Sequence, residues 1–233
     1  MQGHVNSSAA GNRQTERIDA RRIAGIAMFS AIAFVVVCLS KMIPINVAGI
    51  LNPDFKDVVI AMGGFVFGPL AAVFISVFVS ALEMITISST GPVGLIMNVL
   101  STCMLVCPAA VAYRKHRTQR SAVIGLAVGI ILMTAAMMLW NYLITPLYMG
   151  VAREVVAGML IPVFLPFNLL KGGINSALTV LLYKPVVTAL RRARILPESQ
   201  SGTARKTRWG VILIALTVLT ACTMLILVMA GVI

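Results

Sequence analysis

The stretch that decides the fold is residues 58–82, VVIAMGGFVFGPLAAVFISVFVSAL, which carries no charged residue along its whole length. It could form one membrane helix with a kink at Gly68-Pro69, or two shorter helices joined by a tight turn at that dipeptide. The two alternatives place the rest of the chain on opposite sides of a membrane. The charges around the stretch therefore have to be considered with it.

The composition indicates an integral membrane protein. Of the 233 residues, 59% are hydrophobic and 11% are charged, whereas a soluble domain carries roughly 25% charged residues. Several uncharged runs reach the length of about 18 residues that suggests a bilayer span. The net charge of +12 is typical of basic cytoplasmic loops and does not by itself indicate nucleic-acid binding. Candidate spans lie at about 23–41, 53–67, 69–87, 94–113, 121–147, 161–190 and 210–232.

The distribution of basic residues favours two helices within residues 58–82. Loops on the cytoplasmic side of a membrane are enriched in Lys and Arg. With two helices and a cytoplasmic N-terminus, the cytoplasmic segments hold four, four and seven basic residues, and the external loops hold only Lys41, Lys56 and Arg153. The cytoplasmic set is Arg13, Arg17, Arg21, Arg22, Arg114, Lys115, Arg117, Arg120, Lys184, Arg191, Arg192, Arg194, Arg205, Lys206 and Arg208.

This distribution predicts an all-α, multi-pass membrane protein. A polar cytoplasmic tail, disordered or loosely helical, covers residues 1–21, and a core of six membrane helices covers 22–191. The second of these helices is short, with about 15 residues, and need not cross the membrane fully. A basic cytoplasmic linker over 192–208 leads to an extra transmembrane helix over 209–233.

Lys171 is the most unusual residue of the apolar segments. It lies in PFNLLKGGINSALTVLLYK, residues 166–184, on one helix face with Asn168 and Asn175. A lysine in the membrane costs about 2.5–3.5 kcal/mol on insertion scales, so it normally faces a cavity or a partner. Three interpretations remain open: a polar ligand pocket, a structural role with an ion pair to Glu83 and helix–helix hydrogen bonds from the amides, or a proton relay.

Other residues extend or limit the pocket hypothesis. Asn98 and Asn141 lie in other apolar runs, and amides flanked by Trp, Tyr and Met suit a flat, partly aromatic ligand.

The four cysteines indicate neither a disulfide framework nor a metal site, and no cofactor is expected. No nucleotide-binding motif is present in the sequence, so any ATP-driven step would need another chain.

Pairs of small residues four positions apart allow helices to approach closely. Ala27 and Ala31 form one such pair, and Gly125 and Gly129 form another.

Several blocks together resemble the substrate-binding S component of energy-coupling factor (ECF) vitamin transporters, and in particular its riboflavin-specific branch. The blocks run in order from about residue 22 to 190: NPDFKDVVIAMGGFVFGPLAAV (52–73), TGPVGLIMNVLS (90–101), CPAAVAYRKHR (107–117), NYLITPLY (141–148) and PFNLLKG (166–172). Two features depart from the family pattern. They are the seventh apolar segment and the compact stretch between Tyr148 and Pro162.

The resemblance implies a six-helix S-component fold with a vitamin pocket near the outer face, covered by the loop at about 42–54. Asn168 and Lys171 match family residues that help bind riboflavin. Asn141 matches another pocket residue, and Asn98 falls within the corresponding block of the fourth helix. By this resemblance the protein is expected to be the riboflavin-binding subunit of an importer in a bacterial cell membrane. It is not expected to be an enzyme.

The resemblance also implies partners, namely a transmembrane coupling subunit and two ATPases. Ala27 and Ala31 match the alanine motif by which S components dock on the coupling subunit. Three other functions remain as alternatives: an S component for a different vitamin, an ion-coupled secondary transporter that uses Glu83 and Lys171, and an intramembrane enzyme with Lys171 as its base.

Overall fold

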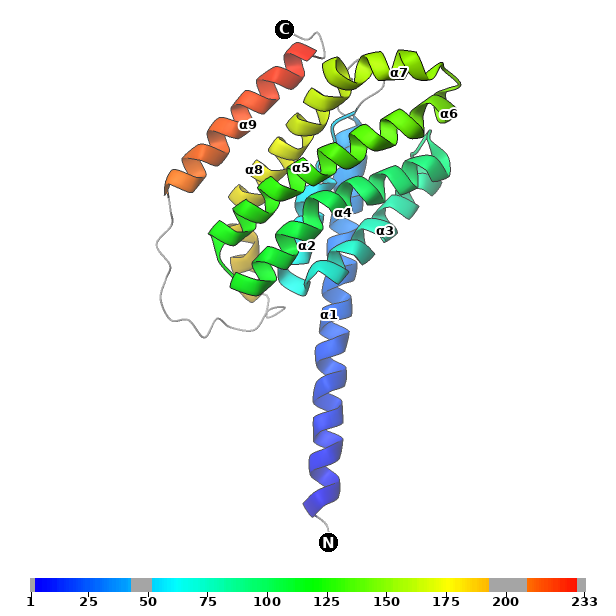
Figure 1. Ribbon diagram of the computed structural model, residues 1–233. Coiled ribbons are helices and arrows are strands. Elements are labelled where there is room, and N and C mark those ends of the chain that lie inside the picture. Colours follow the sequence, from blue (N-terminus) through cyan, green and yellow to red (C-terminus); the bar gives the residue numbers. More distant parts are fainter. Residues whose placement is uncertain (1–2, 43–51, 193–208, 230–233) are drawn as a thin grey trace.

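The computed structural model describes residues 3–42, 52–192 and 209–229, and the regular structure in these ranges is entirely helical (Figure 1). The helices are α1 (Gly3–Met42), α2 (Lys56–Phe67), α3 (Pro69–Thr86), α4 (Gly91–His116), α5 (Gln119–Leu143), α6 (Thr145–Met149), α7 (Arg153–Met159), the π-helix η1 (Leu160–Phe164), α8 (Leu165–Arg192) and α9 (Trp209–Met229).

Five stretches of the described residues are long and apolar enough to cross a membrane, which confirms a multi-pass membrane protein. These stretches are Ala20–Met42, Pro69–Thr86, Gly91–His116, Gln119–Leu143 and Arg153–Leu190. The predicted tail is helical from Gly3 and continues without a break into the first stretch. The predicted extra helix is present as α9, and most of the predicted linker before it lies outside the described residues.

Residues 58–82 form two helices, as the distribution of basic residues predicted. Gly68 separates α2 from α3 and has a φ of 98°, which a residue with a Cβ rarely adopts. Pro69 follows in the first turn of α3, where its missing N–H leaves no intrahelical hydrogen bond unmade. With 12 residues, α2 is about 18 Å long, less than the roughly 30 Å of the hydrocarbon core of a bilayer.

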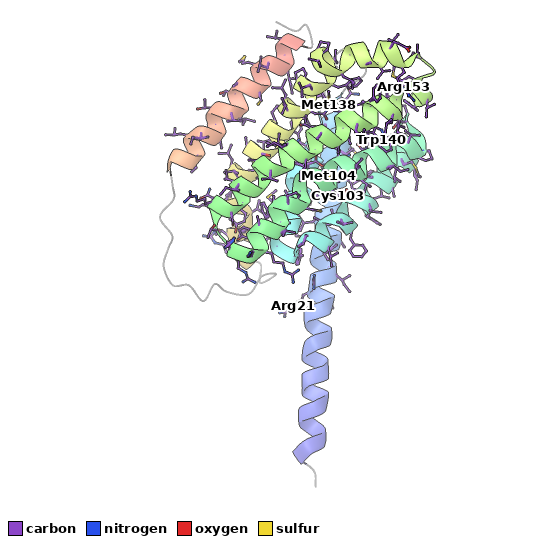
Figure 2. All side chains as sticks on the ribbon, in the orientation of Figure 1. Arg21, Cys103, Met104, Met138, Trp140 and Arg153 are labelled. Atoms are coloured by element: carbon purple, nitrogen blue, oxygen red, sulfur yellow. The ribbon has the colours of Figure 1, made fainter. Side chains whose placement is uncertain are left out.

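Basic side chains gather at the end of the bundle where α2 and α3 meet. The guanidinium group of Arg22 donates a hydrogen bond to the carbonyl oxygen of Phe67 at 3.1 Å, and Arg114 lies beside Gly68. The N-terminal part of α1 projects beyond this end (Figure 1). Arg21 lies at the base of the bundle and Arg153 at the opposite end (Figure 2). This arrangement agrees with the predicted topology, while the side that faces the cytoplasm stays a prediction.

The glycine pair of α5 makes a close helix contact, as its spacing predicted. A Cβ on Gly129 would lie 2.1 Å from the carbonyl oxygen of Leu105, and one on Gly125 would lie 2.5 Å from the Cα of Ala109. Glycine at both positions therefore lets α5 pack directly against the backbone of α4. The alanine pair behaves differently, because Ala27 and Ala31 are exposed on the outer face of α1.

The last helix packs along α8 at the edge of the bundle (Figure 1). Its side chains Leu219, Cys222 and Ile226 contact a cluster on α8 that includes Leu170 and Ile174. Spacings of three and four residues place the three α9 side chains on one helix face. The remaining faces of α9 are largely exposed, as expected for a helix surrounded by lipid.

Candidate functional site

Three lysines and three carboxylates of the described residues form one connected cluster at the end of the bundle opposite the basic end. They come from the last turn of α1, the segment that enters α2, and helices α2, α3 and α8. The members are Lys41, Asp54, Lys56, Asp57, Glu83 and Lys171. Along α1, Lys41 lies roughly 28 Å from Arg22, and along α2, Lys56 lies roughly 17 Å from Phe67 at the basic end.

Lys171 is paired with acidic residues of the segment that enters α2. Its Nζ lies 2.9 Å from Asp54 Oδ2 and 4.0 Å from Asp57 Oδ2, and its side chain is only 8% exposed. The side-chain amide of Asn175 holds the same segment, because it donates hydrogen bonds of 3.0 Å to the carbonyl oxygens of Asp54 and Lys171. The cost of burying the ammonium group is thus offset by two carboxylates of opposite charge.

The predicted ion pair between Lys171 and Glu83 is not formed. Glu83 instead pairs with Lys56, whose Nζ lies 2.8 Å from its Oε2, and with Lys41 at 3.3 Å. The assignment of Lys56 to an external loop was wrong, since it is the first residue of α2 and is completely buried. Lys56 also lies 3.9 Å from Asp54 Oδ2, which joins the two halves of the cluster.

Hydrogen bonds from α4 complete the cluster. Thr102 donates to Asp57 Oδ1 at 2.6 Å, and the Asn98 amide donates to Glu83 Oε2 at 3.1 Å. The Asp54 carboxylate contacts Lys171 Nζ at 2.9 Å and so holds Lys171 in place.

Three buried acceptor oxygens around Lys171 have no hydrogen-bond donor among the described residues. They are Asp54 Oδ1, Asp57 Oδ2 and Asn175 Oδ1. Buried polar atoms are almost always satisfied in native proteins, so unsatisfied ones that gather at one place call for an explanation.

Two of the four predicted binding residues, Lys171 and Asn98, are linked to the cluster by described contacts. Asn168 is buried on the same face of α8 as Lys171, one turn earlier, and donates to the carbonyl oxygen of Phe164 at 2.7 Å. Asn98 reaches the cluster through Glu83. Asn141 is buried on α5 and accepts a hydrogen bond from Thr145 at 2.8 Å. No described hydrogen bond or ion pair connects it to the cluster.

Sequence reasoning missed the acidic residues that hold Lys171. Asp54 and Asp57 stand three positions apart in NPDFKD, directly before an apolar run, and that spacing places both carboxylates on one side as a helix begins. The spacing was a usable signal for paired carboxylates. It did not reveal the partner, because Lys171 is more than a hundred residues away along the chain.

The described residues bring no three His, Cys, Asp or Glu side chains into an arrangement that could hold a metal ion. The cluster offers ammonium and amide donors and carboxyl acceptors, and it contains three lysines and three acidic residues. Such an arrangement can bind a polar ligand of zero net charge by hydrogen bonds.

Comparisons with known proteins agree with these observations. Residues 21–183 match the family model described as the ECF transporter, substrate-specific component. The riboflavin transporter RibU of Staphylococcus aureus is 30% identical over 78% of this chain and 98% of its own length. The riboflavin transporter FmnP of Bacillus subtilis is 28% identical over 75% of this chain and 98% of its own length.

A solved structure, that of the S component of a bacterial ECF transporter, superposes on this chain with a TM-score of 0.63. It is 30% identical in sequence, and the match covers 75% of this chain and 99% of the solved one.

Proposed function

Because the chain belongs to the family of substrate-specific components of ECF transporters, we propose that it is the membrane-embedded, high-affinity riboflavin-binding subunit of an importer. A substrate-specific component is a transport subunit and not an enzyme. Such components work with a coupling subunit and ATPase subunits. The ATPase subunits supply the energy for transport, since this sequence contains no nucleotide-binding motif. We further infer a bacterial cell membrane, with the basic end of the bundle and the N-terminus on the cytoplasmic side.

The observation that carries the proposal is the buried polar face of α8, which lies against a charge-balanced cluster. Asn168 and Lys171 lie on this face, and the cluster holds as many carboxylates as ammonium groups. A buried site with no surplus charge favours a neutral ligand, because an ion would enter without a counter-charge. This supports riboflavin over anionic or cationic vitamins, and two relatives described above are named as riboflavin transporters.

Each proposed binding residue has a role that its chemistry permits. Lys171 has an ammonium group that can donate to a ring carbonyl of the flavin, and Asn168 has an amide that can both donate and accept. Asn141 and Asn98 are the other two proposed binding residues, and aromatic and apolar neighbours would contact the faces of the ring.

Ala27 and Ala31 are proposed to form the docking face for the coupling subunit. Both are exposed on α1, next to the exposed apolar side chains Ile23 and Val35. Small side chains at a spacing of four residues leave a shallow groove into which a helix of another subunit can pack.

The proposal is tested on the purified protein by its absorption spectrum and by titration with riboflavin, followed through fluorescence quenching. We expect a co-purified yellow flavin, or saturable binding once that flavin has been removed. The variant Lys171→Met with Asp54→Asn removes one charge of each sign, so the net charge of the cluster does not change. It should weaken binding by about 1–3 kcal/mol.

The matched control is Arg153→Gln with Glu154→Gln, which removes one charge of each sign from exposed positions on α7. It should bind as the parent does. If the protein binds no flavin but binds another vitamin, the riboflavin assignment is wrong. If the Lys171/Asp54 variant is well folded and binds as tightly as the parent, the pocket assignment is wrong.

A further inference from the structure

We propose, on the basis of the riboflavin-binding function above, that Asp57, Asn175 and Asp54 belong to the ligand site and accept hydrogen bonds from the ligand's hydroxyl chain. This assigns to the binding site three residues that had no place in it, and it names the part of the ligand that they bind.

Three buried side-chain oxygens of the cluster are free to accept hydrogen bonds. Asp57 Oδ2, Asn175 Oδ1 and Asp54 Oδ1 are buried and have no donor among the described residues. The other side-chain oxygen of each aspartate is occupied: Asp57 Oδ1 accepts from Thr102, and Asp54 Oδ2 accepts from Lys171. The side-chain nitrogen of Asn175 donates to two carbonyl oxygens, which leaves its oxygen free to accept. All three free atoms are thus acceptors, held in position by the bonds that their partner atoms make.

These acceptors lie around a single group. Lys171 Nζ is 2.9 Å from the Asp54 carboxylate and 4.0 Å from that of Asp57, and Asn175 bonds to the backbone of both Asp54 and Lys171. Asp57 and Asn175 are almost completely buried, whereas the Asp54 side chain remains 16% exposed. The three residues that carry the acceptors therefore all contact Lys171, a lysine already proposed to bind the ligand.

The chemistry of the cluster selects its partner. Unsatisfied buried acceptors favour a ligand with several hydrogen-bond donors close together. The isoalloxazine ring of riboflavin offers one N–H donor, whereas its ribityl chain offers four neighbouring hydroxyl groups. The hydroxyl chain therefore matches the cluster, and the ring matches the amides and aromatic side chains at the other positions.

The test compares two ligands on two proteins. Lumiflavin has the same ring as riboflavin but carries a methyl group in place of the hydroxyl chain. The variant Asp57→Asn keeps the shape of residue 57 and still accepts from Thr102, but it turns the free acceptor into a donor. We expect the parent to bind riboflavin at least about tenfold more tightly than lumiflavin. We expect Asp57→Asn to lose about tenfold for riboflavin and clearly less for lumiflavin, which lacks the hydroxyl chain.

Two outcomes would overturn the inference. Equal affinity of the parent for both flavins would show that the hydroxyl chain is not recognised, whatever the variant does. An equal loss for both flavins in Asp57→Asn would point to a structural role of Asp57. The control is Glu154→Gln, which neutralises an exposed acid on α7 and should bind both flavins as the parent does. Failure of the parent to bind either flavin would instead contradict the proposed function itself.

Discussion

At the residue scale, Gly129 shows how tightly the bundle is packed around the site. A Cβ at this position would lie 2.1 Å from a carbonyl oxygen of α4, which is backbone and cannot rotate away. The variant Gly129→Ala should therefore push α4 and α5 apart and lower stability by about 1–3 kcal/mol. A lower midpoint of thermal unfolding in detergent would show this.

Gly158→Ala is the matched control for that substitution. Gly158 lies in α7 with open space around the position of a Cβ. Alanine there should leave the midpoint unchanged or raise it slightly, because alanine favours a helix over glycine by about 1 kcal/mol. Equal midpoints for both variants would mean that α4 and α5 are not in backbone contact.

At the scale of the element, α9 is the part of the chain that the family pattern did not lead us to expect. It packs on the apolar face of α8, and a Cβ on Gly173 would lie 3.0 Å from Cys222 Sγ. A disulfide places each Cβ at about this distance from the partner sulfur, since the S–S bond is about 2.05 Å long. Gly173→Cys, with the other three cysteines changed to serine, should therefore cross-link to Cys222 on oxidation.

The cross-link is read on a gel after trypsin has cut the basic segment between α8 and α9. The fragments that carry α8 and α9 should stay joined without reductant and separate when it is added. Gly210→Cys, at the start of α9 in open space, is the control and should not cross-link. A Gly173→Cys protein that separates into two fragments without reductant would show that α9 does not pack here.

At the scale of the whole molecule, docking and ligand binding involve different parts of the bundle. Ala27 and Ala31 lie on the outer face of α1, whereas the charged cluster is enclosed by α1, α2, α3, α4 and α8. Ala27→Trp should fill the proposed docking groove and abolish riboflavin uptake in cells. Riboflavin binding by the purified protein should remain at the parent level.

Ala135→Trp is the control for docking, because Ala135 is an equally small, exposed residue on α5. It should leave both uptake and binding intact. Loss of binding together with uptake in Ala27→Trp would assign this position to folding. Full uptake by Ala27→Trp would show that this face of α1 is not the docking face.

The sequence by itself determined the class of the protein and the course of its chain. Uncharged runs and the placement of Lys and Arg depend only on the local sequence, and the cost of moving charge into lipid acts on each segment separately. The break at Gly68, the short α2 and the close packing at Gly125 and Gly129 could therefore be predicted. The same local patterns identified Lys171, Asn168 and Asn98 as candidates.

Only the tertiary structure decided which charges meet. Lys171 pairs with Asp54 and not with Glu83, and Lys56 is buried in the cluster. Ion pairs between distant segments depend on how helices lie against one another, and composition and periodicity carry no such information. A lysine and a carboxylate more than a hundred residues apart become partners only when α2 packs beside α8, and the acceptors left free there follow from that packing.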